Sequence, residues 1–236
     1  MKIYNDLMVL VTGSTRGVGR LIAEHFLHEG ATVIGVARSG ATFEHEKYSH
    51  YELDISDASA VQGLFSRLRK EGAGPDIVVN NAAVLTSQYA LIMPPAAAQD
   101  MVNVNLFAPF MISREAAKLM RKRKWGRIIN IGSMAASLEP EGDSVYAACK
   151  AGLITMSNVL AKEFAAMNVT CNTLGVTAFE TDMLAQLPRD KIEEVIAGNP
   201  IPRFAEADDI LNVVDFFASR RSSYITAQSL FLGGVN

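Results

Sequence analysis

The sequence predicts an α/β fold built around one doubly wound, parallel sheet. Apolar runs of strand length alternate with longer segments of helical period along the 236 residues. A glycine-rich turn separates the first apolar run from the first helical segment. Apolar residues make up 49% of the chain, which is sufficient for one full core at this length. We therefore expect a single domain over residues 1–236.

The expected strands and helices alternate from the N-terminus to the C-terminus. Strands are expected near residues 7–12, 31–37, 48–53, 76–80, 127–132, 169–174 and 228–232. Helices are expected near residues 17–29, 57–70, 97–122, 145–167, 182–197 and 206–219. Right-handed crossovers between such strands place helices on both faces of the sheet and ligands at the carboxyl ends of the strands. Four residues that follow expected strands should meet at this edge: Gly13, Asn81, Ser133 and Thr181.

The first strand and the first helix flank a loop suited to a dinucleotide. The strand is the apolar run from Leu7 to Val11, and T-G-S-T-R-G-V-G-R follows it. Gly13 permits a tight turn, Gly17 lets the backbone approach a pyrophosphate, and Gly19 lets the helix pack closely on the strand. The phosphate oxygens would then lie at the N-terminus of the helix.

A tyrosine and a lysine one helical turn apart predict a proton-transfer site. Tyr146 and Lys150 stand in S-V-Y-A-A-C-K, and Tyr146 follows Ser133 by thirteen positions. Residues at i and i+4 share a helix face, so the ammonium can lie beneath the phenol. A nearby cation stabilises the phenolate and moves the pKa of the tyrosine down from its ordinary value of roughly 10. Ser133 would then hold the substrate oxygen.

Together, T-G-x-x-x-G-x-G and Y-x-x-x-K make the chain resemble the short-chain dehydrogenase/reductase family. The resemblance extends along nearly the whole chain: N-N-A-A at residues 80–83 resembles the family's N-N-A-G, and D-I at residues 54–55 matches its adenine-contacting pair. The ending P-R-F-A-E-A-D-D-I followed by S-Y-I-T-A-Q-S-L-F-L-G-G is similar to that of bacterial 3-oxoacyl-carrier-protein reductases.

This resemblance implies a fold and a set of site residues. The fold is a single-domain Rossmann fold with a seven-stranded sheet. Its substrate loop covers approximately residues 183–205. The implied catalytic residues are Asn105, Ser133, Tyr146 and Lys150. The implied cofactor contacts are Gly13, Ser14, Thr15, Arg16, Gly17, Val18, Gly19, Arg38, Ser39, Asp54, Ile55, Asn81, Ala82, Ala83, Tyr146, Lys150 and Thr181.

The family also implies a role for each catalytic residue. Tyr146 would protonate the substrate oxygen while a hydride reaches the carbonyl carbon. Lys150 would lower the pKa of Tyr146 and bind the nicotinamide ribose. Ser133 would polarise the carbonyl, and Asn105 would anchor a water that links Lys150 to solvent.

The end of the second strand indicates which cofactor is used. In proteins that prefer NAD, an acidic residue at this place binds the adenosine ribose hydroxyls. Ala37 occupies that place, Arg38 follows it, and Arg16 lies inside the glycine-rich loop. Two guanidinium groups can form charge-assisted bonds with a 2′-phosphate, so we expect NADPH/NADP⁺. The alternative is that both are solvated loop cations.

The substrate is less closely defined. Our first expectation is a 3-oxoacyl thioester carried by an acidic carrier protein, which would dock on the basic run at residues 121–124. The alternative explanation of this run is that cations at the end of a helix complement the helix dipole. Glu139, Glu141 and Asp143 suggest instead a neutral or amine-bearing ketone, such as a sugar, polyol or specialised metabolite. A third reading is a non-enzymatic NADPH-binding sensor, but such proteins tend to lack the Tyr/Lys pair.

Two departures from the family pattern concern the cofactor side of the site. Val176 and Thr177 replace the usual Pro-Gly after the sixth strand, which restores an N–H group and removes easy access to positive φ. Ala83 replaces the glycine of N-N-A-G. Neither change removes a catalytic group.

Composition excludes several other classes of protein. The net charge of −3 argues against a general nucleic-acid binder, and no apolar run approaches the roughly 20 residues that span a bilayer. We expect a cytoplasmic location, no metal site, and structural roles for Cys149 and Cys171. The expected helices at 97–122 and 145–167 carry apolar residues on more than one face, which suggests a homotetramer or homodimer.

Overall fold

A computed structural model describes residues 2–180 and 189–234 and contains one parallel sheet of seven strands. The strand order is β3-β2-β1-β4-β5-β6-β7. The strands are β1 (Met8–Thr12), β2 (Thr32–Ala37), β3 (Tyr48–Glu52), β4 (Ile77–Asn80), β5 (Gly126–Ser133), β6 (Val169–Val176) and β7 (Ser229–Phe231). This confirms the expected fold class, a doubly wound parallel sheet.

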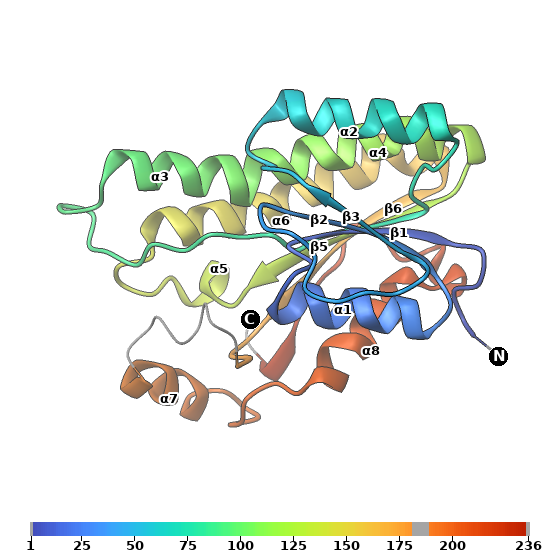
Figure 1. Cartoon of the computed structure of the whole chain (residues 1–236). Helices are drawn as coiled ribbons and strands as arrows, with labels where there is room; N and C mark the ends of the chain where they lie inside the picture. The colour runs from blue at the N-terminus through green and yellow to red at the C-terminus, as the bar shows by residue number, and fades with distance from the viewer. Residues whose placement is uncertain (1, 181–188, 235–236) are drawn as a thin grey trace.

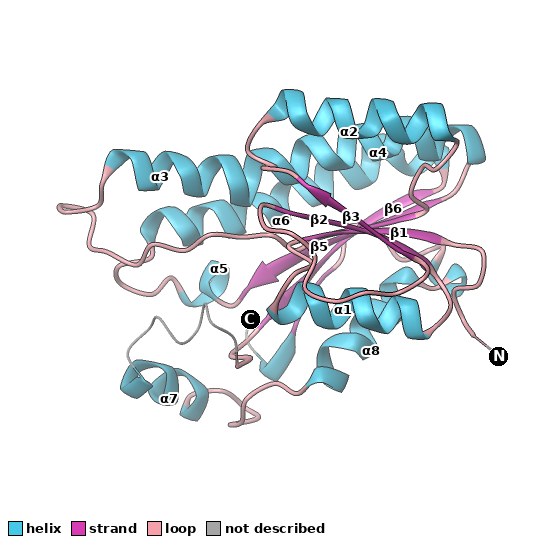
Figure 2. Ribbon diagram, viewed as in Figure 1, coloured by secondary structure: helices cyan, strands magenta, loops and turns pink. Residues whose placement is uncertain are grey.

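Helices cover both faces of the sheet, as Figures 1 and 2 show. The helices are α1 (Gly17–His28), α2 (Ala58–Glu71), α3 (Pro95–Val102), α4 (Ala108–Arg123), α5 (Ala135–Leu138), α6 (Ser144–Phe164), α7 (Arg189–Ala197) and α8 (Ala207–Ala218). In Figure 1, α2, α4 and α6 lie above the sheet, and α1 and α8 lie below it. Among the described residues, no helix is long and apolar enough to cross a membrane.

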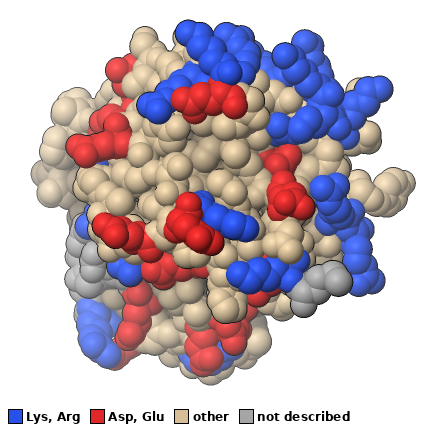
Figure 3. All heavy atoms as spheres, turned by 45° about the vertical axis from the view of Figure 1, so that its right-hand side comes forward, with Lys and Arg blue, Asp and Glu red and all other residues tan. Residues whose placement is uncertain are grey.

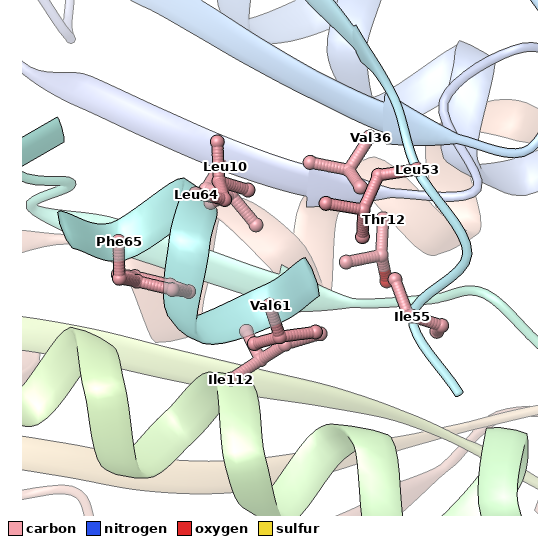
Figure 4. Close-up of a pocket in the computed structure, with 9 residues that line it drawn as sticks. All are labelled: Leu10, Thr12, Val36, Leu53, Ile55, Val61, Leu64, Phe65 and Ile112. Atoms are coloured by element: carbon pink, nitrogen blue, oxygen red, sulfur yellow. The ribbon is translucent and has the colours of Figure 1, made fainter. Parts of the chain in front are cut away.

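Each face of the sheet has its own apolar core. The lower core joins α1 and α8 to the sheet through residues such as Phe26, Ile129 and Phe217. The upper core joins α2, α4 and α6, and Figure 4 shows part of it, where Phe65 of α2 and Ile112 of α4 lie on the side of the sheet that these helices cover, with Leu10 of β1 nearby. The side chains in this view leave no room for a water molecule, so the contact belongs to the core.

The strand order reverses between β1 and β4. The chain runs from β1 outward through β2 and β3, and then returns to pair β4 with the other side of β1. At such a switch point the two loops that leave the strands diverge, and a crevice opens outside the carboxyl ends of the strands. The glycine-rich loop follows β1 at this point, and Asn81 follows β4.

The expected helix at 97–122 is present as one continuous helical run. A π turn, Asn103–Phe107, lies inside it between α3 and α4. π turns inside α-helices are rare and occur frequently at functional sites. Asn105 lies in this turn, and its side chain bonds the backbone of Val84. The π turn thus goes with a contact between segments distant in sequence, which local sequence patterns do not predict.

Other boundaries differ by a few residues. The helix expected at 145–167 ends with α6 at Phe164 and a 3₁₀ turn, Ala165–Met167. Short 3₁₀ turns also occur at Arg220–Ser222 and Leu232–Gly234. β6 continues to Val176, which pairs with Ser133, as the restored N–H group and β-branched side chain at this position allow. Of the helix expected at 182–197, residues 182–188 lie outside the described residues.

Candidate active site

The glycine-rich loop packs tightly against the end of β4. Gly13 has a φ of 68°, which favours glycine. A Cβ atom at Gly19 would lie 2.2 Å from the carbonyl oxygen of Gly13 and 2.3 Å from Nδ2 of Asn81. Any larger residue at this position would force the loop, the helix and the strand end apart. The close approach expected for Gly19 is therefore confirmed.

The first turn of α1 is suited to a dinucleotide pyrophosphate. Its N-cap residue, Arg16, makes no side-chain capping bond, and the first turn contains no acidic residue. By contrast, the Asp57 side chain caps α2, and a reciprocal pair of side-chain bonds closes the start of α8. Among the described residues, the N-cap side chain does not bond the N–H groups that begin α1, an arrangement that suits an anion, which the helix dipole also favours.

Thr12 ties the loop to the residues that follow β4. Its hydroxyl accepts hydrogen bonds from the backbone N–H of Asn81 and of Ala82, both at 3.0 Å. The Asn81 side chain donates in return to the Thr12 carbonyl at 2.9 Å. This arrangement holds residues 81–83 beside Gly13. Thr12 was not among the expected site residues, although its hydroxyl at a strand end was a signal.

The expected catalytic residues Ser133, Tyr146 and Lys150 lie together at the carboxyl edge. The Ser133 hydroxyl, at the end of β5, and the Tyr146 phenol are hydrogen-bonding partners. Lys150 is buried, and its Nζ lies 5.7 Å from the centroid of the Tyr146 ring. Nζ donates a 2.8 Å hydrogen bond to the carbonyl of Ile131. One strand end and one helix face therefore supply the hydroxyl, the phenol and the amine.

Burial reverses the expected shift of the Tyr146 pKa. The sequence predicts a lowered value, but burial raises the pKa of Tyr146 to about 12, and the hydrogen bond from Ser133 only partly opposes this effect. Burial likewise lowers the pKa of Lys150 to about 8. Both shifts are toward the neutral form, although a pKa of about 8 still leaves Lys150 mostly protonated at pH 7. The expectation failed because helical spacing gives proximity but says nothing about desolvation.

Asn105 is buried, and both ends of its amide are engaged. Its Oδ1 accepts from the N–H of Val84 at 2.9 Å, and its Nδ2 donates to the carbonyl of Val84 at 2.8 Å. The side chain thus fixes the segment after β4 to the π turn. The water contact expected for this residue stays a prediction.

Asp143 is a buried acid, whereas the sequence predicted only that it belongs to an acidic stretch at the mouth of the substrate site. Its side chain is 6% exposed, and no described residue gives its Oδ1 a hydrogen bond. It precedes Tyr146 by three positions, so the two share a face of the same helical turn. Burial contributes most to the raised pKa of Tyr146, and the charge of Asp143 raises that pKa further.

The residues expected at the adenosine end follow β2 and β3. Arg38 and Ser39 come directly after β2, and Ile55 is buried beside an exposed Asp54. A backbone hydrogen bond from Ser56 lowers the pKa of Asp54, and the charge of Arg38 adds to this effect. Both segments follow neighbouring parallel strands at the same edge of the sheet. Thr181 lies outside the described residues.

The basic run at residues 121–124 lies at the other edge of the sheet. It ends α4 and precedes β5, whereas Ser133 ends β5. Eight residues of strand, at about 3.3 Å each, put these edges more than roughly 20 Å apart. Figure 3 shows Lys and Arg side chains gathered along the upper part of the molecule, where Figure 1 has α2 and α4. Arg123 is paired with Asp76 at 3.1 Å. Within a single chain, a carrier protein docked on residues 121–124 would therefore lie far from Ser133, so this geometry does not support the proposed docking surface.

The protein has a Rossmann-type α/β fold whose carboxyl edge carries a hydroxyl, a phenol and an amine suited to proton transfer. A family model described as enoyl-(acyl carrier protein) reductase matches residues 13–236. The chain belongs to the short-chain dehydrogenase/reductase family, whose members act on CH–OH and C=O groups with a nicotinamide cofactor.

Curated relatives and solved structures are similar over nearly the full chain. The 3-oxoacyl-[acyl-carrier-protein] reductase FabG of Escherichia coli (strain K12) is 35% identical over 98% of this chain and 97% of its own. FabG of Pseudomonas aeruginosa is 34% identical over 96% of each. The structure of Thermoplasma acidophilum aldohexose dehydrogenase has a TM-score of 0.89 at 28% identity and covers 98% of this chain and 94% of its own.

Proposed function

We propose that this protein is an NADPH-dependent reductase that transfers a hydride to a ketone carbonyl, with 3-oxoacyl thioesters as its first substrate class. The observation that carries the proposal is the meeting of Ser133, Tyr146 and Lys150 at the carboxyl edge of the sheet, the same edge from which the glycine-rich loop leaves β1. The similarity to FabG enzymes over the whole chain supports the thioester as substrate.

The proposed chemistry divides between the cofactor and the chain. Bound NADPH supplies the hydride. The Ser133 hydroxyl holds the substrate oxygen and orients the carbonyl. Tyr146, which is protonated at neutral pH because burial keeps its pKa at about 12, donates its proton to the oxygen as negative charge develops there. Lys150, with a pKa lowered to about 8 by burial, is suited to return a proton to the phenol.

The NADPH preference rests on Ala37, Arg16 and Arg38. The chain has no carboxylate at the end of β2 to bind an unmodified ribose, and it has two guanidinium groups in the adjacent loops. A homotetramer or homodimer and a cytoplasmic location are further parts of this proposal. Val102, Phe107 and Val159 are exposed on α3, the π turn and α6, which supports a subunit interface there.

A substrate panel tests the proposed function. NADPH oxidation would be followed with the N-acetylcysteamine thioester of a 3-oxoacyl group, and the same reaction would be repeated with NADH. We expect turnover with the thioester and a kcat/KM at least tenfold higher, to order of magnitude, for NADPH. Turnover of other ketones without turnover of thioesters would contradict the proposed substrate.

Asp143 favours a second candidate, the reduction of ketones that carry a hydroxyl or ammonium group near the carbonyl. A buried carboxylate oxygen to which no described residue donates is costly, and a donor on the substrate would satisfy it. The likeness to an aldohexose dehydrogenase structure is in keeping with such a substrate. Hydroxy and amino ketones belong in the same panel, with Asp143→Asn beside the native chain. A selective loss of these substrates in the variant would support this candidate, and an equal loss for thioesters would oppose it.

A further inference from the structure

The connection between β2 and β3 folds back onto the glycine-rich loop. Residues 38–47 join the two parallel strands without a helix. The Thr42 hydroxyl donates to the Thr15 carbonyl at 2.6 Å, and the Ser39 hydroxyl donates to the Thr15 hydroxyl at 3.4 Å. The loop that carries Arg38 is therefore in contact with the loop expected to hold the phosphates.

A chain of hydrogen bonds through β3 connects the same two loops. The Ser14 and Tyr48 hydroxyls lie 2.9 Å apart, and the Tyr48 hydroxyl lies 2.9 Å from Nδ1 of His50. Nε2 of His50 lies 2.8 Å from the carbonyl oxygen of Ser39. Ser14 and Ser39 are both expected cofactor contacts. Tyr48 and His50 were not predicted, because only the fold brings β3 beside the glycine-rich loop.

The chemistry of the groups fixes the direction of these bonds. The Ser39 carbonyl can only accept, so Nε2 of His50 carries the proton and donates it. In the neutral ring Nδ1 is then an acceptor, and Tyr48 donates to it. The Tyr48 oxygen is left to accept from the Ser14 hydroxyl. Every donor in the chain has an acceptor, so the two loops are held at a defined separation.

The neighbouring strand makes room for this chain of bonds. A Cβ atom at Gly35 of β2 would lie 2.0 Å from the Tyr48 hydroxyl oxygen and 2.5 Å from the Ser14 hydroxyl oxygen. Glycine inside a strand is ordinarily unfavourable, and it often marks a close approach by another group. Here the group that approaches is the Tyr48 phenol, which passes over Gly35 and bonds the Ser14 hydroxyl.

We propose that Tyr48 and His50 are positioning residues that hold the Arg38–Ser39 loop against the glycine-rich loop and thereby set the discrimination for the 2′-phosphate of NADPH. The proposal rests on the NADPH preference proposed above. His50 fixes the Ser39 carbonyl, one residue after Arg38, so the guanidinium begins from an ordered backbone. NADH has no phosphate at this place, so its binding depends less on this loop.

Cofactor titration tests the proposal without any substrate. The dissociation constants of NADPH and NADH would be measured by cofactor fluorescence for the native chain, His50→Leu, His50→Gln and Tyr48→Phe. His50→Leu should weaken NADPH binding by about tenfold and NADH binding by less than about threefold. His50→Gln can still donate to Ser39 and should recover part of the loss. Tyr48→Phe removes the bond to His50 and also frees the Ser14 hydroxyl in the phosphate loop, so it should weaken both cofactors, and NADPH by more than NADH.

His45→Leu is the matched control. His45 is an exposed histidine of the same connection, and its ring accepts a hydrogen bond from the Lys47 N–H at 3.1 Å. This variant should bind both cofactors like the native chain. Thermal unfolding midpoints would show that each variant is folded at the titration temperature.

The possible failures are distinguishable. A native chain that binds NADPH no more tightly than NADH would contradict the proposed cofactor and, with it, this inference. If the native preference is present, equal losses of NADPH and NADH affinity in His50→Leu would overturn the positioning role alone. An equally large effect of His45→Leu would do the same.

Discussion

Lys150 lies with its ammonium 5.7 Å from the ring centroid of Tyr146 and donates to the Ile131 carbonyl 2.8 Å away. Both side chains are buried, and burial moves their pKa values in opposite directions, to about 8 for Lys150 and about 12 for Tyr146. Burying the charged form of Lys150 therefore lowers the free energy of unfolding of the free protein. Such a cost is expected where a residue serves chemistry.

Replacing Lys150 with methionine should therefore stabilise the free protein and abolish turnover. We expect the free energy of unfolding at neutral pH to rise by roughly 1–3 kcal/mol, because a buried charge is replaced by an apolar group of similar length. Urea denaturation of both proteins measures the change. A less stable variant at neutral pH would contradict this account of Lys150.

The gain from Lys150→Met should also depend on pH. The pKa of Lys150 falls from 10.5 in the unfolded chain to about 8 in the folded protein, so between these values the unfolded chain binds more protons. Stability from this group therefore increases as pH rises through that window. The advantage of the variant should be greatest below pH 8 and should shrink toward pH 10.5. A stability advantage of Lys150→Met that grows between these pH values would contradict the lowered pKa of Lys150.

Asp143→Asn should shift the alkaline limb of the reduction to lower pH. Reduction needs a protonated Tyr146, whose pKa is raised first by burial and also by the charge of Asp143. Removing that charge lowers the pKa, so kcat/KM should begin to fall at a lower pH. The pH profile of kcat/KM measures the shift. Glu139→Gln, a change at an exposed acid of the rim, should leave the profile in place.

Two glycine-to-alanine substitutions should have opposite effects. In Gly19→Ala the new methyl group meets the Gly13 carbonyl at 2.2 Å, so we expect about 1–3 kcal/mol of destabilisation and loss of NADPH binding. Gly63 lies within α2 with open space around it, so Gly63→Ala should gain about 0.5–1 kcal/mol. Thermal unfolding with and without NADPH compares them. Normal NADPH binding by Gly19→Ala would show that the loop does not need this close approach.

A charge at Phe107 should dissociate the proposed oligomer. Phe107 is 44% exposed in the π turn beside α4, and burying a glutamate there against a second subunit would be unfavourable. Light scattering should report a tetramer or dimer for the native chain and a smaller species for Phe107→Glu. Phe216 on α8 is 45% exposed, on the other face of the sheet, and Phe216→Glu should leave the mass unchanged. A monomeric native chain would refute the proposed interface.

The strands, the crossover helices and the convergence of Gly13, Ser133 and Tyr146 follow from local patterns. Apolar periodicity marks the elements, and parallel topology brings the strand ends to one edge. The π turn at Asn105, the burial of Asp143 and the partners of His50 depend on contacts between distant segments. The sign of the Tyr146 pKa shift was wrong for the same reason, since desolvation depends on the packed fold.

The most direct test of the central claim compares the native chain with Tyr146→Phe in two assays, kcat/KM for a 3-oxoacyl thioester and the dissociation constant of NADPH. Loss of the proposed general acid should lower kcat/KM by about 100-fold or more, while NADPH affinity stays within about twofold of the native value. A variant that keeps most of the native kcat/KM would show that Tyr146 does not supply the proton.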